Sequence, residues 1–152
     1  MALKKSKQVL AGFPVPSPLD AAALLPIVAE VVVPVGGFAI GDVVEMGPIP
    51  NNCVIVDLVV HNSVGTASAT AAFGLLSGVY GSNDGARTCG NELIAAYSIA
   101  TAALTRLGKP VTTDTQADDT KAWGFVIAGA GMPAGQIVRA TLLVAPAPIG
   151  IA

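Results

Sequence analysis

"GDVVEMGPIPNNCVIVDLVVHN", residues 41–62, places two valine-rich runs on either side of a segment rich in proline, glycine and asparagine. β-branched residues favour strands, whereas glycine, proline and asparagine favour turns. We therefore expect strands over residues 43–46 and 53–61, joined by a rigid turn from Gly47 to Asn52. In this interpretation the stretch is a corner between core strands and not a reactive loop.

The rest of the chain repeats this pattern of short apolar runs separated by turn residues. In residues 53–61 the even positions, from Val54 to Val60, form one continuous apolar face. Further strands are expected over residues 28–33, 67–75, 121–128 and 137–145. The last of these has Val138, Ala140, Leu142 and Val144 on one side. Trp123 shares a face with Phe125 and Ile127, which predicts a core position.

One segment fits two kinds of structure. In "NELIAAYSIATAAL", residues 91–104, apolar residues follow a helical spacing, but the second half fits a strand equally well. We expect a short helical turn followed by a strand. Many short strands without a βαβ rhythm predict an all-β fold, an antiparallel β-sandwich or jelly roll, over residues 27–145, followed by a tail at 146–152.

Residues 1–26 differ in composition and are expected to form an extended N-terminal arm. "GFPVPSPL" alternates proline with other residues, which favours an extended backbone. Within the arm, Ser17 as N-cap, Pro18 at the first helical position and Asp20 predict one short helix that Pro26 ends. Exposure of the arm's apolar side chains to water would be unfavourable, so we expect them to bind a neighbouring subunit. They are Phe13, Val15, Leu19, Leu24 and Leu25.

Composition limits the possible partners. Apolar residues make up 53% of the chain and charged residues 12%, against about a quarter in an ordinary globular domain. No uninterrupted apolar run is long enough for a membrane helix, and no secretory signal is visible, so cytoplasmic synthesis is expected. The apolar surplus is expected to face other protein subunits. The basic N-terminus, with Lys4, Lys5 and Lys7, is expected to be solvated; contact with an acidic neighbour or nucleic acid is the alternative. The rest of the chain is acidic, which argues against a nucleic-acid-binding face.

A search for catalytic or metal-binding patterns finds none that is persuasive, so no enzyme activity, cofactor or small-molecule substrate is expected. His61 is the only histidine, and Asp57 on the same strand face would lie roughly 13 Å away, too far for a dyad. Cys53 and Cys89 lack the spacing of a zinc site and are expected to be buried or half-buried thiols, with a disulfide as the alternative. A solvated loop is expected for Asp114, Asp118 and Asp119.

The order of segments resembles a known family. "GDVVEMGPIPNNCVIVDLVV", "TASATAAFGLL", "NELIAAYSIATAAL" and "KAWGFVIAGAGMPAGQIVRATLLV", within residues 38–145, are similar to the head decoration or capsid cement proteins of tailed bacteriophages. The resemblance implies a β-sandwich or jelly roll. It also implies a dimer or trimer that binds the outer surface of the icosahedral shell of major capsid protein and braces it against DNA pressure. The proline-rich arm departs from the shortest relatives.

Two other functions remain open at this point. One is a different phage structural module, such as a head fibre base or a tail component. The other is a carbohydrate-binding β-sandwich, whose site would require exposed aromatic side chains such as Trp123 or Tyr80.

Overall fold

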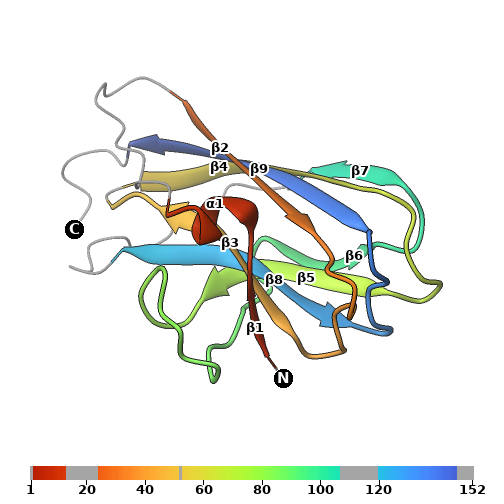
Figure 1. The fold of residues 1–152 in the computed structure, drawn as a ribbon. Coiled ribbons are helices and arrows are strands. Elements are labelled where there is room, and N and C mark those ends of the chain that lie inside the picture. The colour runs from red at the N-terminus through yellow and green to blue at the C-terminus, as the bar shows by residue number, and fades with distance from the viewer. Residues whose placement is uncertain (1, 13–23, 52, 107–119, 147–152) are drawn as a thin grey trace.

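The chain folds into two stacked β-sheets (Figure 1). The computed structural model describes residues 2–12, 24–51, 53–106 and 120–146 of the 152 residues. Its elements are β1 (Leu3–Lys5), α1 (Lys7–Leu10), β2 (Leu25–Val32), β3 (Val43–Ile49), β4 (Cys53–Asn62), β5 (Thr70–Leu76), β6 (Ile94–Ser98), β7 (Ala103–Arg106), β8 (Lys121–Ala128) and β9 (Ile137–Pro146). The expected all-β class is confirmed. No helix in the described part of the chain is long and apolar enough to cross a membrane.

The chain passes repeatedly between the two layers. Sheet A has the strand order β1-β3-β8-β5-β6, and sheet B has the order β2-β9-β4-β7. Every strand pair is antiparallel except the parallel pair of β1 with β3. Among these pairs only β5 and β6 join strands that follow one another in the chain. The sandwich is therefore held together mainly by pairing between distant parts of the sequence.

The core lies between the two sheets and contains the large side chains that the sequence places there. Trp123 and Phe125 of β8 are fully buried, as predicted, and Phe125 packs on Phe73 with ring centroids 5.0 Å apart. On β9 the predicted apolar face from Val138 to Val144 is also buried. Burying these alternating positions from both sheets supplies most of the driving force for folding.

The predicted apolar face of β4 is only half correct. Cys53 and Ile55 are fully buried and Val56 is exposed, whereas Leu58 and Val60 are buried. The pairing with β9 shifts register between Ile55 and Asp57, so a β-bulge inserts one extra residue. Because side chains alternate between the faces of a strand, the bulge moves the apolar set from odd to even positions.

The predicted corner at Gly47 is shorter than expected. β3 continues through Gly47 and Pro48 to Ile49, and these residues pair with β8 after a bulge at Met46. A Cβ on Gly47 would lie 3.3 Å from the indole Nε1 of Trp123, a tight contact that glycine avoids. The chain changes from sheet A to sheet B only between Ile49 and Cys53.

The helical turn predicted at the start of residues 91–104 is absent. This segment forms β6 and β7 instead. Leu93, Tyr97 and Ile99, all at odd-numbered positions, are buried. That spacing belongs to a strand, and pairing of β6 with β5 outweighs the helical stripe.

The N-terminal residues join the sandwich. β1 adds to the edge of sheet A, and Ser6 caps α1 by accepting a hydrogen bond from the Val9 amide. Most of the helix expected after Ser17 lies outside the described residues, whereas Leu25 already belongs to β2.

Candidate interaction surface

The residues singled out for chemistry do not form a reactive site. Asp57 accepts hydrogen bonds from the Leu58 amide and from the Arg106 guanidinium, while His61 is exposed further along β4. Within the described ranges no group of histidine, cysteine and carboxylate side chains could hold a metal ion. Asp114, Asp118 and Asp119, for which a solvated loop was expected, lie outside these ranges.

Neither cysteine is part of a disulfide, which agrees with the thiols expected from the sequence. Cys53 is buried, and Cys89 is half-buried within the connection between β5 and β6. Burial raises the pKa of both thiols, and that of Cys89 reaches about 12. Since only thiolates are strong nucleophiles, both cysteines are inert at neutral pH.

The outer face of sheet A is covered by the chain itself. Residues 77–92 fold over it, and Val43, Leu76 and Ala122 form a second, smaller buried cluster there. Arg87 from this covering segment donates to the Glu45 carboxylate at 2.7 Å, and both side chains are almost fully buried. The chain itself therefore covers the part of this face around Val43, Leu76 and Ala122.

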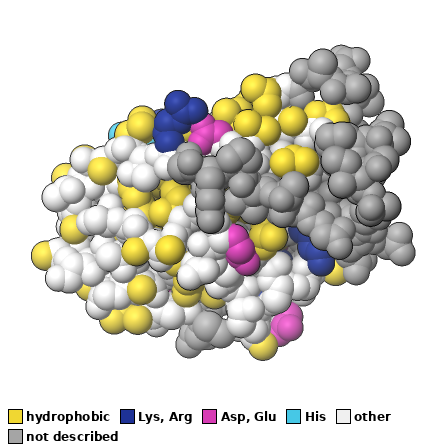
Figure 2. All heavy atoms as spheres, turned by 180° about the vertical axis from the view of Figure 1, so that it is seen from behind, with side chains coloured by type: hydrophobic (Ala, Val, Ile, Leu, Met, Phe, Trp, Pro, Cys, Tyr) yellow, Lys and Arg dark blue, Asp and Glu magenta, His cyan; other side chains and the backbone are white. Residues whose placement is uncertain are grey.

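The outer face of sheet B is the large exposed sheet surface of the described chain, and we call it the outer B face. Its exposed large apolar side chains are Val28, Val32, Val56, Leu104 and Ile137. The exposed His61, Arg106 and Arg139 share this face. Half-buried Val54, Val59 and Leu143 lie among them on neighbouring strands. In Figure 2 hydrophobic side chains gather along the upper edge of the molecule, on both sides of a contacting basic and acidic pair. An apolar sheet face of this kind is typical of a protein-binding surface.

The carboxylates on the outer B face are paired with basic groups. Glu30 accepts hydrogen bonds from Lys7 at 2.8 Å and from Arg139, and Asp57 is paired with Arg106. Hydrogen bonds from Lys7 and Arg139 hold the pKa of Glu30 below its ordinary value. The face therefore carries no concentrated charge for nucleic acid or another highly charged partner to bind.

The basic N-terminus, which was expected to be solvated, contacts its own chain. Lys4 lies 3.9 Å from the Asp42 carboxylate, and Lys5 donates to the Gly81 carbonyl at 2.8 Å and to Asn83. Lys7 pairs with Glu30. These contacts were not visible in the sequence because their acceptors lie far along the chain.

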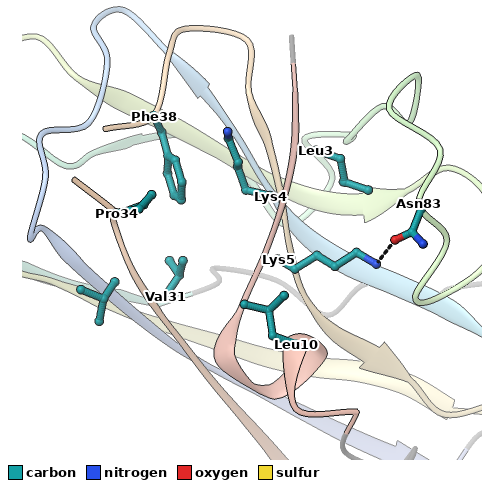
Figure 3. Close-up of a pocket in the computed structure, with 9 residues that line it drawn as sticks. Leu3, Lys4, Lys5, Leu10, Val31, Pro34, Phe38 and Asn83 are labelled. Carbon is teal, nitrogen blue, oxygen red and sulfur yellow. Dashed lines mark hydrogen bonds between the residues drawn. The ribbon is translucent and has the colours of Figure 1, made fainter. Parts of the chain in front are cut away.

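A hollow of about 430 Å³ lies beside this N-terminal segment (Figure 3). It is lined by Leu3, Lys4, Lys5, Leu10, Val31, Val32, Pro34, Phe38 and Asn83. Lys5 reaches across one side of it to Asn83. The described lining is mainly apolar, with Lys4, Lys5 and Asn83 as its polar side chains.

The predicted partner-binding residues are only partly described. Leu24 is 56% exposed just before β2, and Leu25 pairs with Val144 and packs against the core. Phe13, Val15 and Leu19 lie outside the described residues. Leu24 thus extends the exposed apolar surface, whereas Leu25 belongs mainly to the sandwich.

Comparison with known proteins places this fold among phage capsids. Neither a family model nor a curated protein matches the sequence. A chain in the solved capsid of Ralstonia phage GP4 matches with a TM-score of 0.80 and 26% identity, over 95% of this chain and 97% of that one. A chain in the cyanophage Pam1 capsid asymmetric unit matches with a TM-score of 0.55 over 90% and 96% of the two chains; at 14% identity it shows a shared fold only. The comparisons support a capsid-related structural protein of a phage.

Proposed function

We propose that the chain is a structural virion protein that binds the outer surface of an icosahedral phage capsid and cements its shell of major capsid protein. The likeness to the Ralstonia phage GP4 capsid chain carries this proposal, because it covers nearly the whole of both chains. The protein would be synthesised in the host bacterial cytoplasm and would act on the virion without a cofactor and without catalysing a reaction.

The strand order supports a jelly roll as the exact form of the sandwich. Without β1, the two sheets read β3-β8-β5-β6 and β2-β9-β4-β7. A jelly roll pairs eight strands in two four-stranded sheets through Greek-key connections, a fold common in capsid proteins. In this assignment β1 and α1 are an N-terminal addition to the edge of the module.

The outer B face is the part of the described surface best suited to the shell. Its exposed apolar side chains would lose their contact with water against the shell, and its carboxylates Glu30 and Asp57 are already paired with basic groups. Leu24 borders it, and the arm residues Phe13, Val15 and Leu19 would add contacts to a neighbouring subunit. Many copies, each contacting more than one capsid protein, would brace the shell by multivalency.

The described surface does not favour carbohydrate binding. Phe38, Phe73, Tyr97, Trp123 and Phe125 are all buried, and Tyr80 is half-buried. Among the described residues, therefore, no exposed aromatic ring is available to stack on a sugar.

The proposal is tested with DNA-filled shells of the cognate phage assembled without this chain. Purified protein is added, and bound copies per major capsid subunit and the temperature of DNA release are measured. We expect a fixed, saturable ratio and a higher release temperature. Val28→Glu, on the outer B face, should weaken binding at least tenfold, whereas Val35→Glu, at a 97% exposed position between β2 and β3, should leave it unchanged. Absence of saturable binding by the wild-type chain would refute the proposal.

A further inference from the structure

Strand register places polar side chains of the outer B face in one row across the sheet. Glu30 of β2 lies opposite Arg139 of β9, and Arg139 lies opposite His61 of β4. His61 in turn lies opposite Leu104 of β7. Residues directly opposite each other on one face have Cβ atoms about 4.5–5.5 Å apart. Arg139 and His61, which are both exposed, are therefore close enough for one small group to contact both side chains.

Apolar residues flank this row on both sides. On one side Val32 lies opposite Ile137. On the other side Val28, Thr141 and Val59 lie opposite one another on three neighbouring strands. A partner that covers the apolar side chains therefore also covers the polar row and removes it from water.

The exposed charge of the outer B face is basic. The side chains of Lys7, Arg139 and Arg106 are 61%, 57% and 67% exposed. The carboxylates with which they pair, Glu30 and Asp57, belong to side chains that are only 19% and 8% exposed. In Figure 2 the basic side chain on the upper edge projects beyond the acidic side chain beside it. An approaching partner thus meets cationic groups first.

The charges described on this face do not balance. Glu30 pairs with both Lys7 and Arg139, whereas Asp57 pairs with Arg106. Three basic side chains therefore share two carboxylates, and the surplus positive charge lies where Glu30 serves two partners. The described contacts of Arg139 with Glu30 use its Nε and Nη2 groups. The two N–H donors of its Nη1 can serve a partner.

Covering this unbalanced charge places a requirement on the partner. A charge removed from water is costly unless it is paired and hydrogen-bonded. A purely apolar partner surface would bury the surplus cation without compensation. A partner carboxylate would compensate it, and the interaction strengthens as the apolar residues on both sides exclude water and lower the local dielectric.

The same charges argue against two other occupants. Two copies of this chain packed face to face would double the basic surplus and supply no compensating carboxylate, whatever their register. Nucleic acid is bound mainly by neutralising several phosphates, and the surplus here is a single charge beside many apolar side chains. The face therefore fits an unlike protein surface that is mainly apolar and carries a carboxylate.

We propose that the outer B face binds an aspartate or glutamate carboxylate of the major capsid protein between Arg139 and His61. Arg139 donates to this carboxylate through Nη1, and His61 donates through a ring N–H. The apolar residues on both sides of the row pack against the partner around this contact. The inference rests on the proposed function, because it names the chemistry of the shell surface that the face covers.

The test measures the dissociation constants of purified variants on DNA-filled shells that lack this chain. Arg139→Met removes a donor and leaves Glu30 paired with Lys7, and His61→Glu places a carboxylate where the partner's would lie. Each should weaken binding at least about tenfold. His61→Gln keeps a neutral N–H donor and should retain more binding than His61→Glu. Val35→Glu adds the same charge at a 97% exposed position outside the sheet and should bind like the wild type.

Two further readouts separate charge from packing. Because both substituted positions are exposed, circular dichroism should show the wild-type fold in the variants. Shells whose carboxylates have been amidated with a carbodiimide and a neutral amine should bind the wild type at least about tenfold more weakly. Binding of Arg139→Met should change much less, because this variant no longer offers the donor. Added salt should likewise weaken wild-type binding more than that of Arg139→Met.

The outcomes distinguish this inference from the proposed function. If the wild type binds saturably and Arg139→Met and His61→Glu bind equally well, the inference fails while the proposed function stands. Wild-type binding that amidation leaves unchanged has the same meaning. If light scattering shows that the purified chain is a dimer and that Arg139→Met makes it a monomer, the occupant is a second copy and the inference is overturned. A wild type that binds no shell would refute both.

Discussion

Removing Arg87 should reveal how strongly the covering segment of residues 77–92 depends on one buried ion pair. Arg87 and Glu45 are 2% and 0% exposed as side chains, and the guanidinium also donates to the Ser77 carbonyl at 2.7 Å. In Arg87→Met the Glu45 carboxylate stays buried, with the Gly81 amide at 3.0 Å as its remaining described donor. Leaving one partner of a buried pair costs about 3–5 kcal/mol, which for a chain of this size lowers Tm by about 6–20 °C.

The double variant Glu45→Gln/Arg87→Met separates the pair from the packing. Glutamine keeps an acceptor for the Gly81 amide but removes the buried charge. Glu45 Oε2 and Arg87 Nη2 also make no hydrogen bond within the described structure, so the pair is only partly satisfied. The double variant should therefore recover at least about 2 kcal/mol relative to Arg87→Met.

Denaturant unfolding at fixed protein concentration, followed by fluorescence of the buried Trp123, measures both variants. Arg139→Met is the control, because Arg139 is 57% exposed and its contact with Glu30 should contribute no more than about 1 kcal/mol. A loss below about 1 kcal/mol in Arg87→Met, or a double variant less stable than the single one, would refute this reasoning.

Three further predictions follow from individual contacts. Gly124→Ala would place a Cβ 1.9 Å from the Val44 carbonyl oxygen, so it should lower the free energy of unfolding by more than about 3 kcal/mol. The control Gly85→Ala has open space around it and should change this free energy little. If denaturant unfolding finds Gly124→Ala as stable as the wild type, the result would count against the pairing of β3 with β8. Burial raises the pKa of the Cys89 thiol to about 12. At pH 8 this thiol should therefore react with a disulfide reagent at least a hundredfold more slowly in the folded chain than in the unfolded chain. Rapid labelling of Cys89 in the folded chain would contradict its burial. Hydrogen bonds from Lys7 and Arg139 lower the folded-state pKa of Glu30, so its stabilising effect is present above its ordinary pKa of 4.5 and is lost as pH falls through the lower folded value. In unfolding measured against pH, the stability difference between the wild type and Glu30→Gln should shrink over that range. A difference that grows as pH falls would show that the sign of this effect is wrong.

The fold class could be predicted from the sequence because the strands repeat with period two. From Val138 to Val144 and from Trp123 to Ile127, apolar side chains occupy every second position, and all of them face the core. The bulges at Met46 and Val56 could not be predicted, since a bulge depends on the partner strand and leaves no local signature. The strand at residues 94–98 was partly hidden because its alanines fit a helix equally well, and only pairing with β5 decides the outcome.

The interaction surface was less predictable than the fold. The sequence indicated apolar surplus and a need for protein partners, but it directed attention to the arm and not to the outer B face. That face is assembled from β2, β4, β7 and β9, which are distant in the chain.

The most direct test of the capsid proposal is a cryo-EM reconstruction of the virion of the phage that encodes this chain. The account predicts density for the two-layered sandwich on the outer surface of the head, at joints between major capsid subunits, with the outer B face toward the shell. Density for the sandwich only in the tail or at a fibre base, or its absence from the particle, would contradict the proposed function.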